Sequence, residues 1–224
     1  MIESILPEGT VAVDTFIDPP GVTLFPEEEA LVKQAVEKRR REFTTARWCA
    51  RRAMAGLGRP PAAVLRGKRG EPLWPAGVVG SMTHCAGYRG AVLASRDSFT
   101  TIGVDAEPDE PLPDGVLAAV TRPDERSRID DLRRADPSVR WDRLLFSAKE
   151  SVYKSWFPLT SRWLDFEEAD LVIDPSAGTF SARLLATGGR IDGRELTGFD
   201  GRWMVGEGLI LTAIAVPAAA RSGG

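Results

Sequence analysis

The sequence is poor in the residues that build disulfide frameworks and transition-metal sites. Its 224 residues include one histidine, His84, and two cysteines, Cys49 and Cys85, which are not clustered as metal-finger ligands are. Zinc sites take clustered cysteine and histidine ligands, so a zinc enzyme is not expected. His84 and Cys85 are neighbours in a predicted strand and would point to opposite faces, which argues against a Cys–His nucleophile pair. We expect a reduced, cytoplasmic protein.

Long apolar runs are also missing. No uninterrupted run approaches the roughly 18 residues of a membrane span. The first twenty residues carry acidic but no basic side chains, so no secretory signal is expected either. A net charge of −3 and a pI of about 5.4 argue against a dedicated nucleic-acid binder. The length suits one large domain or two of about 110 residues each, in a protein of ordinary globular composition.

Hydrophobic spacing and turn residues predict a mixed α/β fold. Residues 1–25 resemble an irregular lead-in, and Pro26 followed by three glutamates begins a helical pattern. Residues 217–224 are expected to form a disordered tail. The pattern predicts helices over 26–57 (with room for a bend), 115–135 and 141–156, and strands near 63–65, 78–84, 90–94, 101–105, 170–174, 179–186, 190–197 and 202–216.

Residues 108–115 are the best candidate for a linker between two halves. They hold three prolines and a glycine among acidic residues, which predicts an N-terminal half over 1–108 and a C-terminal half over 109–224. A weak internal echo supports two similar halves. Phenylalanine is followed by polar residues at i+4 and i+8 in two predicted helices, 103 residues apart: Phe43, Arg47 and Arg51, then Phe146, Glu150 and Lys154.

Two carboxylates, on Asp105 and Glu107, follow the apolar strand segment 102–104. Residues i and i+2 of a strand point to the same side, so both carboxylates would project together. Their repulsion requires a cation, a proton or solvent, and Mg²⁺ prefers oxygen ligands of this kind. The alternative is an exposed strand end beside an acidic linker.

A second polar pair lies on the predicted helix 141–156. Glu150 and Lys154 are one turn apart on the same face. They are interpreted either as an ordinary helix salt bridge or as a third metal ligand beside a phosphate-binding lysine.

Basic residues gather in the first half of the chain. They form either solvated helix faces or a phosphate site, since arginine binds phosphate oxygens in bidentate fashion. Thr83 and His84 are further donors that can reach a phosphate, and glycines on both sides of residues 68–69 would let the backbone approach a ligand. The basic residues are Lys38, Arg39, Arg40, Arg41, Arg47, Arg51, Arg52, Arg66, Lys68 and Arg69.

Together these segments resemble the 4′-phosphopantetheinyl transferases of the large, Sfp-type class, and the actinobacterial members in particular. The family has an apolar-Gly-apolar-Asp-x-Glu strand end, matched by residues 102–107. About forty residues later it has an aromatic-x-x-Lys-Glu-x-x-x-Lys helix, matched by 146–154. A Ser/Thr-His pair at a strand end matches Thr83 and His84. The similarity to the actinobacterial members extends over 70–92 and 156–160, and the whole resemblance covers about residues 18–216.

The resemblance implies a pseudo-dimer of two similar α/β halves with the active site at their interface. It implies Mg²⁺-dependent transfer (Mn²⁺ being possible) of 4′-phosphopantetheine from coenzyme A to a serine of acyl or peptidyl carrier proteins. The likeness to the family assigns Asp105, Glu107 and Glu150 to the metal, Glu150 and Lys154 to catalysis, and Lys154 and Asp105 to the pyrophosphate region. It assigns Arg39, Arg47, Arg66 and His84, with Lys68, Arg69 and Thr83 as weaker candidates, to the adenosine and 3′-phosphate end.

Two other functions stay open at this point. A Mg²⁺-dependent phosphohydrolase or nuclease would use the same three carboxylates without a carrier protein. A non-catalytic protein would bind nucleic acid through the arginine-rich helix 37–52, with an affinity that falls steeply with salt. A monomer without a nucleic-acid or membrane partner is expected. The sequence does not distinguish fatty-acid, polyketide and nonribosomal-peptide carriers.

Overall fold

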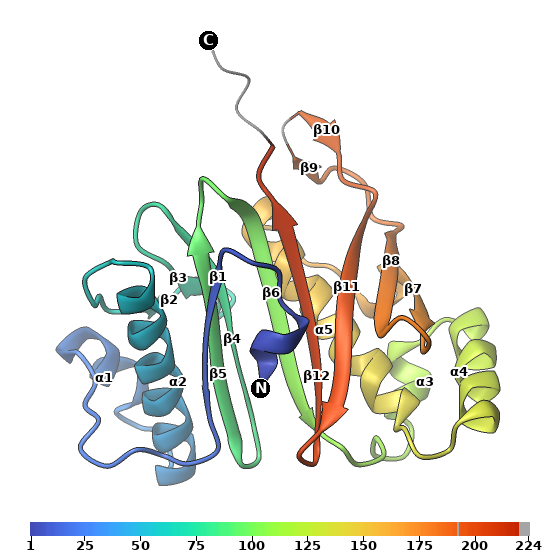
Figure 1. Cartoon of the computed structure of the whole chain (residues 1–224), viewed down its shortest axis with the longest axis horizontal. Helices are drawn as coiled ribbons and strands as arrows, with labels where there is room; N and C mark the ends of the chain where they lie inside the picture. Colours follow the sequence, from blue (N-terminus) through green and yellow to red (C-terminus); the bar gives the residue numbers. More distant parts are fainter. Residues whose placement is uncertain (192, 220–224) are drawn as a thin grey trace.

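The computed structural model describes residues 1–191 and 193–219, and two β-sheets organise them (Figure 1). The first sheet has the strand order β1-β5-β4 and the second the order β6-β12-β11-β8-β7; every neighbouring pair in both is antiparallel. Helix α2 packs against the first sheet and α5 against the second. In this part of the chain no helix is both long and apolar enough to cross a bilayer.

The first half begins with a short 3-10 helix and a strand, and its long helix precedes a β-hairpin. Its elements are η1 (Ile2–Ile5), β1 (Thr10–Thr15), α1 (Pro26–Val32), α2 (Glu37–Gly56), β2 (Leu65–Arg66), β3 (Pro72–Leu73), β4 (Val78–Cys85) and β5 (Tyr88–Ser95).

The second half has the same plan with extra strands. Its elements are β6 (Phe99–Pro108), α3 (Val116–Val120), α4 (Pro123–Ala135), α5 (Trp141–Thr160), η2 (Phe166–Glu168), β7 (Ala169–Asp174), β8 (Thr179–Leu184), β9 (Arg190–Ile191), β10 (Arg194–Glu195), β11 (Gly198–Gly206) and β12 (Leu209–Pro217). The order β6-β12-β11 corresponds to β1-β5-β4, which confirms two similar α/β halves.

A buried glutamate repeats in the two halves. Glu28 of α1 accepts the backbone N–H of Val64 at 2.8 Å and a guanidinium N–H of Arg51 from α2, also at 2.8 Å. Glu125 of α4 accepts the N–H of Leu171 at 2.8 Å and an ammonium N–H of Lys149 from α5 at 2.7 Å. Each glutamate also accepts the N–H of the residue that precedes its own helix.

These glutamates give one measure of the register of the repeat. The offsets, from Glu28 to Glu125 and from Arg51 to Lys149, are 97 and 98 residues. The helices α2 and α5 themselves begin and end 104 residues apart, close to the 103 residues of the echo predicted from the sequence. The exact register of that echo stays a prediction.

Several predicted boundaries need correction. The lead-in contains β1, which pairs with β5; every β1 residue is half-buried, so it lacks the alternation of a typical surface strand. The helix predicted over 26–57 is two helices, and the one over 115–135 is broken ahead of Pro123. The strand predicted over 202–216 is the hairpin β11–β12. In the predicted tail, Pro217 ends β12 and Ala218 donates to the Ser98 carbonyl, whereas residues 220–224 lie outside the described part.

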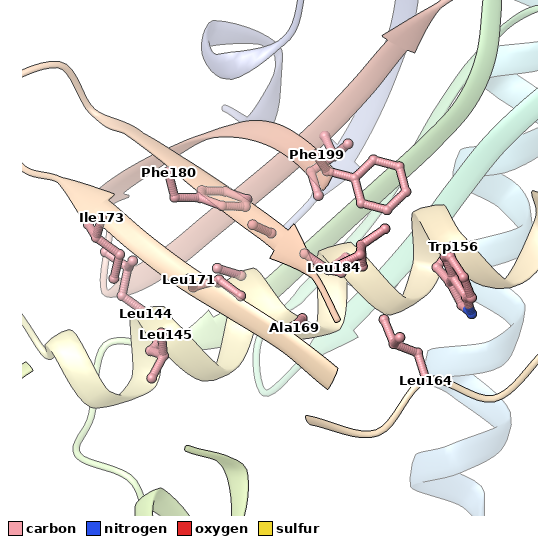
Figure 2. Close-up of a cluster of buried hydrophobic side chains, with 14 of the residues drawn as sticks. Leu144, Leu145, Trp156, Leu164, Ala169, Leu171, Ile173, Phe180, Leu184 and Phe199 are labelled. Atoms are coloured by element: carbon pink, nitrogen blue, oxygen red, sulfur yellow. The ribbon is translucent and has the colours of Figure 1, made fainter. Parts of the chain in front are cut away.

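The largest apolar core lies between α5 and the second sheet (Figure 2). Trp156 and Leu144 of α5 are fully buried there, against strand residues such as Leu171, Phe180 and Phe199. Burying side chains of this size contributes about 1.5–3 kcal/mol each. The core therefore fixes α5 rigidly, together with the polar residues on the face of α5 that turns towards β6.

The two sheets meet where β4 lies beside β6, without a backbone ladder between them. Side-chain hydroxyls of β4 accept the N–H groups that β6 directs away from β12. Ser81 Oγ accepts from Val104 N at 3.1 Å, and Thr83 Oγ1 accepts from Ala106 N at 3.0 Å. These buried amides would otherwise be unsatisfied, at a cost of about 1–3 kcal/mol each.

Helix α5 crosses β6 very closely at Gly103. A Cβ placed there would overlap the Ser151 carbonyl oxygen and Ser155 Oγ of α5. We expect Gly103→Ala to destabilise the fold by about 1–3 kcal/mol through overpacking, measured by urea unfolding. The matched control is Gly206→Ala in β11, where the added Cβ would meet only side-chain methyl groups at 3.6 Å. Equal stability of the two variants would contradict the close approach.

Candidate active site

A pocket opens between the two halves, and residues of both line it. The first half contributes α2, the β2–β3 hairpin and β4, and the second half contributes α5. The predicted site residues that line it are Arg39, Arg47, Arg66, Arg69, His84, Glu150 and Lys154.

Arg39 and His84 lie together on the side of the pocket that the first half of the chain forms. A guanidinium nitrogen of Arg39 lies 2.5 Å from His84 Nε2. Because a guanidinium only donates, His84 Nε2 accepts this hydrogen bond, and the imidazole is neutral. Burial, with help from the positive charge of Arg39, lowers the pKa of His84. An anionic ligand bound here would meet both a charged guanidinium and an uncharged, polar imidazole.

Arg47 and Arg66 both lie over the ring of Phe43, with guanidinium carbons 3.2 and 5.1 Å from its centroid. Arg47 is buried and donates to the Val64 carbonyl at 3.0 Å, and its Nε lies 3.8 Å from the Glu28 carboxylate. Burial lowers the pKa of Arg47 to about 9, against the opposing effect of Glu28. Several cations held this closely form a site that an anion would stabilise.

The Asp105 carboxylate lies at the seam between the halves. Lys154 Nζ donates to its Oδ1 at 2.6 Å and to the Val104 carbonyl at 3.1 Å, and Thr83 Oγ1 lies 3.3 Å from the same Oδ1. The other oxygen, Oδ2, is buried without a hydrogen-bond partner. Lys154 therefore pairs with Asp105 of β6, and the predicted helix salt bridge to Glu150 is not among the ion pairs of the described chain.

Glu107 is held by Arg143, a residue that the sequence reasoning did not single out. An Arg143 guanidinium nitrogen donates to Glu107 Oε2 at 2.8 Å, and the same side chain donates to the Glu110 and Pro111 carbonyls. Burial and the charge of Asp105 raise the pKa of Glu107, against the effect of Arg143. The interpretation of Glu107 as a merely exposed strand end is wrong, because its side chain is largely buried.

Glu150 projects into the pocket from α5. Among the described residues, none forms a hydrogen bond or ion pair with its carboxylate. Burial raises its pKa; the ammonium of Lys154 opposes this, and the charges of Asp105 and Glu107 add to it. A half-buried carboxylate with a raised pKa suits a proton acceptor.

The three carboxylates fit a hard divalent cation by chemistry, though the side chains are not drawn together around one point. In the described chain no three His, Cys, Asp or Glu residues are close enough to hold a metal as they stand. Lys154 and Arg143 instead neutralise Asp105 and Glu107. The unpartnered, buried Asp105 Oδ2 is the observation that favours a cation, because a bare buried carboxylate oxygen is costly.

A second recess adjoins the first and shares Glu150 and Tyr153 with it. Its wall is aromatic: the Tyr153 and Trp163 ring centroids are 5.1 Å apart, and Phe166 lies beyond. Arg69 of the β2–β3 hairpin lies 5.8 Å from the Trp163 centroid, so a first-half residue reaches across the junction. This recess was not predictable from the sequence, because Trp163 lies in a segment without a periodic pattern.

The remaining predicted residues lie outside the pocket lining. Lys68 is exposed at the tip of the β2–β3 hairpin. Thr83 is buried, and its hydroxyl lies towards Asp105. Glu28 was missed, although the repeated pattern Pro-acidic-Glu at 26–28 and 123–125 was a signal that could have identified both buried glutamates.

Comparison with known proteins gives matches over nearly the whole chain. Residues 27–94 match the model of the 4′-phosphopantetheinyl transferase N-terminal domain, and residues 101–200 match that of the 4′-phosphopantetheinyl transferase superfamily.

Three relatives align with this chain over nine tenths or more of their own length. The chain is 56% identical to the 4′-phosphopantetheinyl transferase Svp of Streptomyces mobaraensis, over 98% of this chain and 91% of that protein. It is 50% identical to Npt of Nocardia iowensis (96% and 99%) and 48% identical to PptT of Mycobacterium tuberculosis (96% and 98%), both also 4′-phosphopantetheinyl transferases. With this similarity from end to end and a pocket that joins cations to carboxylates, the chain belongs to the 4′-phosphopantetheinyl transferase superfamily.

Proposed function

We propose that this protein transfers the 4′-phosphopantetheine arm of coenzyme A to a serine hydroxyl of an acyl or peptidyl carrier protein and releases adenosine 3′,5′-bisphosphate. The observation that carries the proposal is the pocket between the halves, where cations of α2 and the β2–β3 hairpin face Glu150 and Lys154 of α5. A molecule with phosphates at one end and a reacting pyrophosphate further along matches this order of charges.

The two recesses support one orientation of coenzyme A. Its 3′-phosphate and adenosine would lie against Arg39, Arg47, Arg66 and His84, and its pantetheine arm along the aromatic recess beside Tyr153 and Trp163. The pyrophosphate would then lie at the junction of the recesses, next to Glu150 and Lys154. Arg69 reaches the same junction; Lys68, which is exposed, is left as a peripheral contact.

The chemistry assigned to the chain's own residues is proton removal and charge compensation. Glu150 takes the proton of the carrier serine hydroxyl as the serine oxygen bonds to the β-phosphorus. The bond from that phosphorus to the bridging oxygen breaks, and the departing phosphate keeps the electron pair. Lys154 compensates the charge that develops there, at a position where Asp105 already orients its ammonium group.

Asp105, Glu107 and Glu150 would hold Mg²⁺ or Mn²⁺. When bound, such an ion neutralises pyrophosphate charge and lowers the repulsion met by the attacking oxygen. Asp105 offers its free Oδ2, and Glu107 keeps one oxygen that Arg143 does not occupy. Metal binding weakens a carboxylate as a base, so the two roles of Glu150 compete.

We propose a division of labour between the halves, with coenzyme A binding mainly to the first and the metal and catalytic residues on the second. The boundary predicted at residue 108 leaves β6 in the first half, yet the strand pairs with β12 of the second sheet. A boundary ahead of Phe99 is better supported, and the gap between the two family matches falls at 95–100.

Because one chain supplies both sides of the pocket, we propose a monomer as the active unit.

The test is intact-mass spectrometry of apo carrier proteins incubated with the protein, coenzyme A and Mg²⁺, with and without chelator. We expect the phosphopantetheine mass on the carrier only when metal is present. A set of fatty-acid, polyketide and nonribosomal-peptide carriers would also reveal the preferred partner. Cleavage of coenzyme A without any carrier would favour a phosphohydrolase, and salt-sensitive nucleic-acid binding without transfer would favour the binding protein.

Glu150→Gln is expected to abolish transfer, because the amide cannot accept the serine proton. The fold should persist. Burial raises the pKa of Glu150, so the folded state disfavours its charge, and the free energy of unfolding falls as pH rises through that pKa. Glutamine escapes this cost; with chelator at neutral pH the variant should be at least as stable as the wild type in urea unfolding. Unfolding of the variant would contradict the assignment.

Arg66→Ala is expected to raise the KM for coenzyme A about tenfold, the loss expected for one charge-assisted phosphate contact, with a smaller change in kcat. Arg66 is exposed and lines the pocket, so its loss should spare the fold. The control is Arg52→Ala, an exposed arginine of α2 that lies over Trp48 outside the lining. Steady-state kinetics with varied coenzyme A measures both, and equal effects would remove Arg66 from the site.

A further inference from the structure

Thr83 is buried at the seam between β4 and β6, and its hydroxyl serves two partners. The Ala106 N–H donates to Thr83 Oγ1 at 3.0 Å, so a lone pair of the hydroxyl is used there. The hydroxyl proton is then free to point at Asp105 Oδ1, 3.3 Å away. Thr83 thereby links the first half to the Asp105 carboxylate of β6 at the seam.

The two oxygens of Asp105 are in contrasting environments. Oδ1 accepts a hydrogen bond from Thr83 and another, at 2.6 Å, from Lys154. These two donors satisfy the oxygen that faces the seam. Oδ2 is buried without a partner, and the whole residue is only 5% exposed. A cation that arrives from outside would stabilise a charged oxygen left bare in this way.

We propose that Thr83 is a positioning residue, which fixes the Asp105 carboxylate so that Oδ2 is presented to the divalent cation. The inference rests on the proposed function for the presence of that cation. The expectation that Thr83 also contacts the phosphate end of coenzyme A stays a prediction beside it. Threonine suits the position, because its methyl group packs in the buried seam while its hydroxyl bonds on both sides.

Ser81 provides a matched control within the same strand. It lies two residues earlier on the same face of β4, and its hydroxyl accepts the Val104 N–H at 3.1 Å. The described structure shows no bond from Ser81 to a carboxylate. Its removal therefore costs the seam a comparable bond without releasing Asp105.

The experiment is a Mn²⁺ titration of the full-length protein with coenzyme A present, followed by the electron paramagnetic resonance of free Mn²⁺ and corrected with a coenzyme A blank. Thr83→Val and Thr83→Ala should each weaken Mn²⁺ binding tenfold or more, the effect typical of losing a group that orients a metal ligand. Thr83→Ser and Ser81→Ala should remain within about threefold of the wild type. Circular dichroism confirms that each variant is folded, and two hydroxyl-free variants guard against one that fails to fold.

Wild-type affinity in Thr83→Val or Thr83→Ala would overturn the proposal. An equal loss of Mn²⁺ affinity in Ser81→Ala would also overturn it, because it would show a general effect of the seam. A wild-type protein that binds no Mn²⁺ would overturn it as well. The readout needs no carrier protein, so it separates the two hypotheses. If no carrier is modified but the pattern of Mn²⁺ affinities holds, the proposed transfer fails and the role of Thr83 stands.

Discussion

The hydrogen bonds from β6 to the hydroxyls of Ser81 and Thr83 are the constraint on which the junction of the two halves depends. Strand β6 is the edge of the second sheet, and its outward amides need acceptors that no neighbouring backbone ladder supplies. Because β4 provides those acceptors through side chains, the halves meet without merging into one sheet. The meeting brings His84 and the arginines of one half opposite Glu150 and Lys154 of the other.

Each half is also stabilised internally by its buried glutamate. Glu125 and Lys149 are almost completely inaccessible to solvent, and removing one partner of such a pair typically costs about 3–5 kcal/mol. Lys149 also donates to the Phe166 carbonyl, so the pair joins α4, α5 and η2. Glu150 follows Lys149 directly, and its place in the pocket is therefore set by a contact on another side of the same helix.

The parts of the site that local patterns encode were predictable from the sequence. The spacing of Asp105 and Glu107 on an apolar strand, and of Glu150 and Lys154 on a helix, placed all four in the region where the structure finds them. The partners of these groups were not predictable. Lys154 pairs with Asp105 and not with Glu150, and Arg143 pairs with Glu107. These pairings depend on how β6 and α5 pack, which local sequence patterns do not encode. The strand β1 was missed for a related reason, since its pairing with β5 decides its structure.

The arrangement of both halves on one chain has a consequence for how the pocket behaves at low protein concentration. If the halves were separate subunits, dilution below their dissociation constant would take the cations away from the carboxylates. Here the β5–β6 turn, residues 96–98, connects the halves covalently. The effective concentration of one half at the other therefore does not depend on the protein concentration. A scarce enzyme with this architecture keeps its pocket intact, and each half was free to specialise without having to recognise a copy of itself.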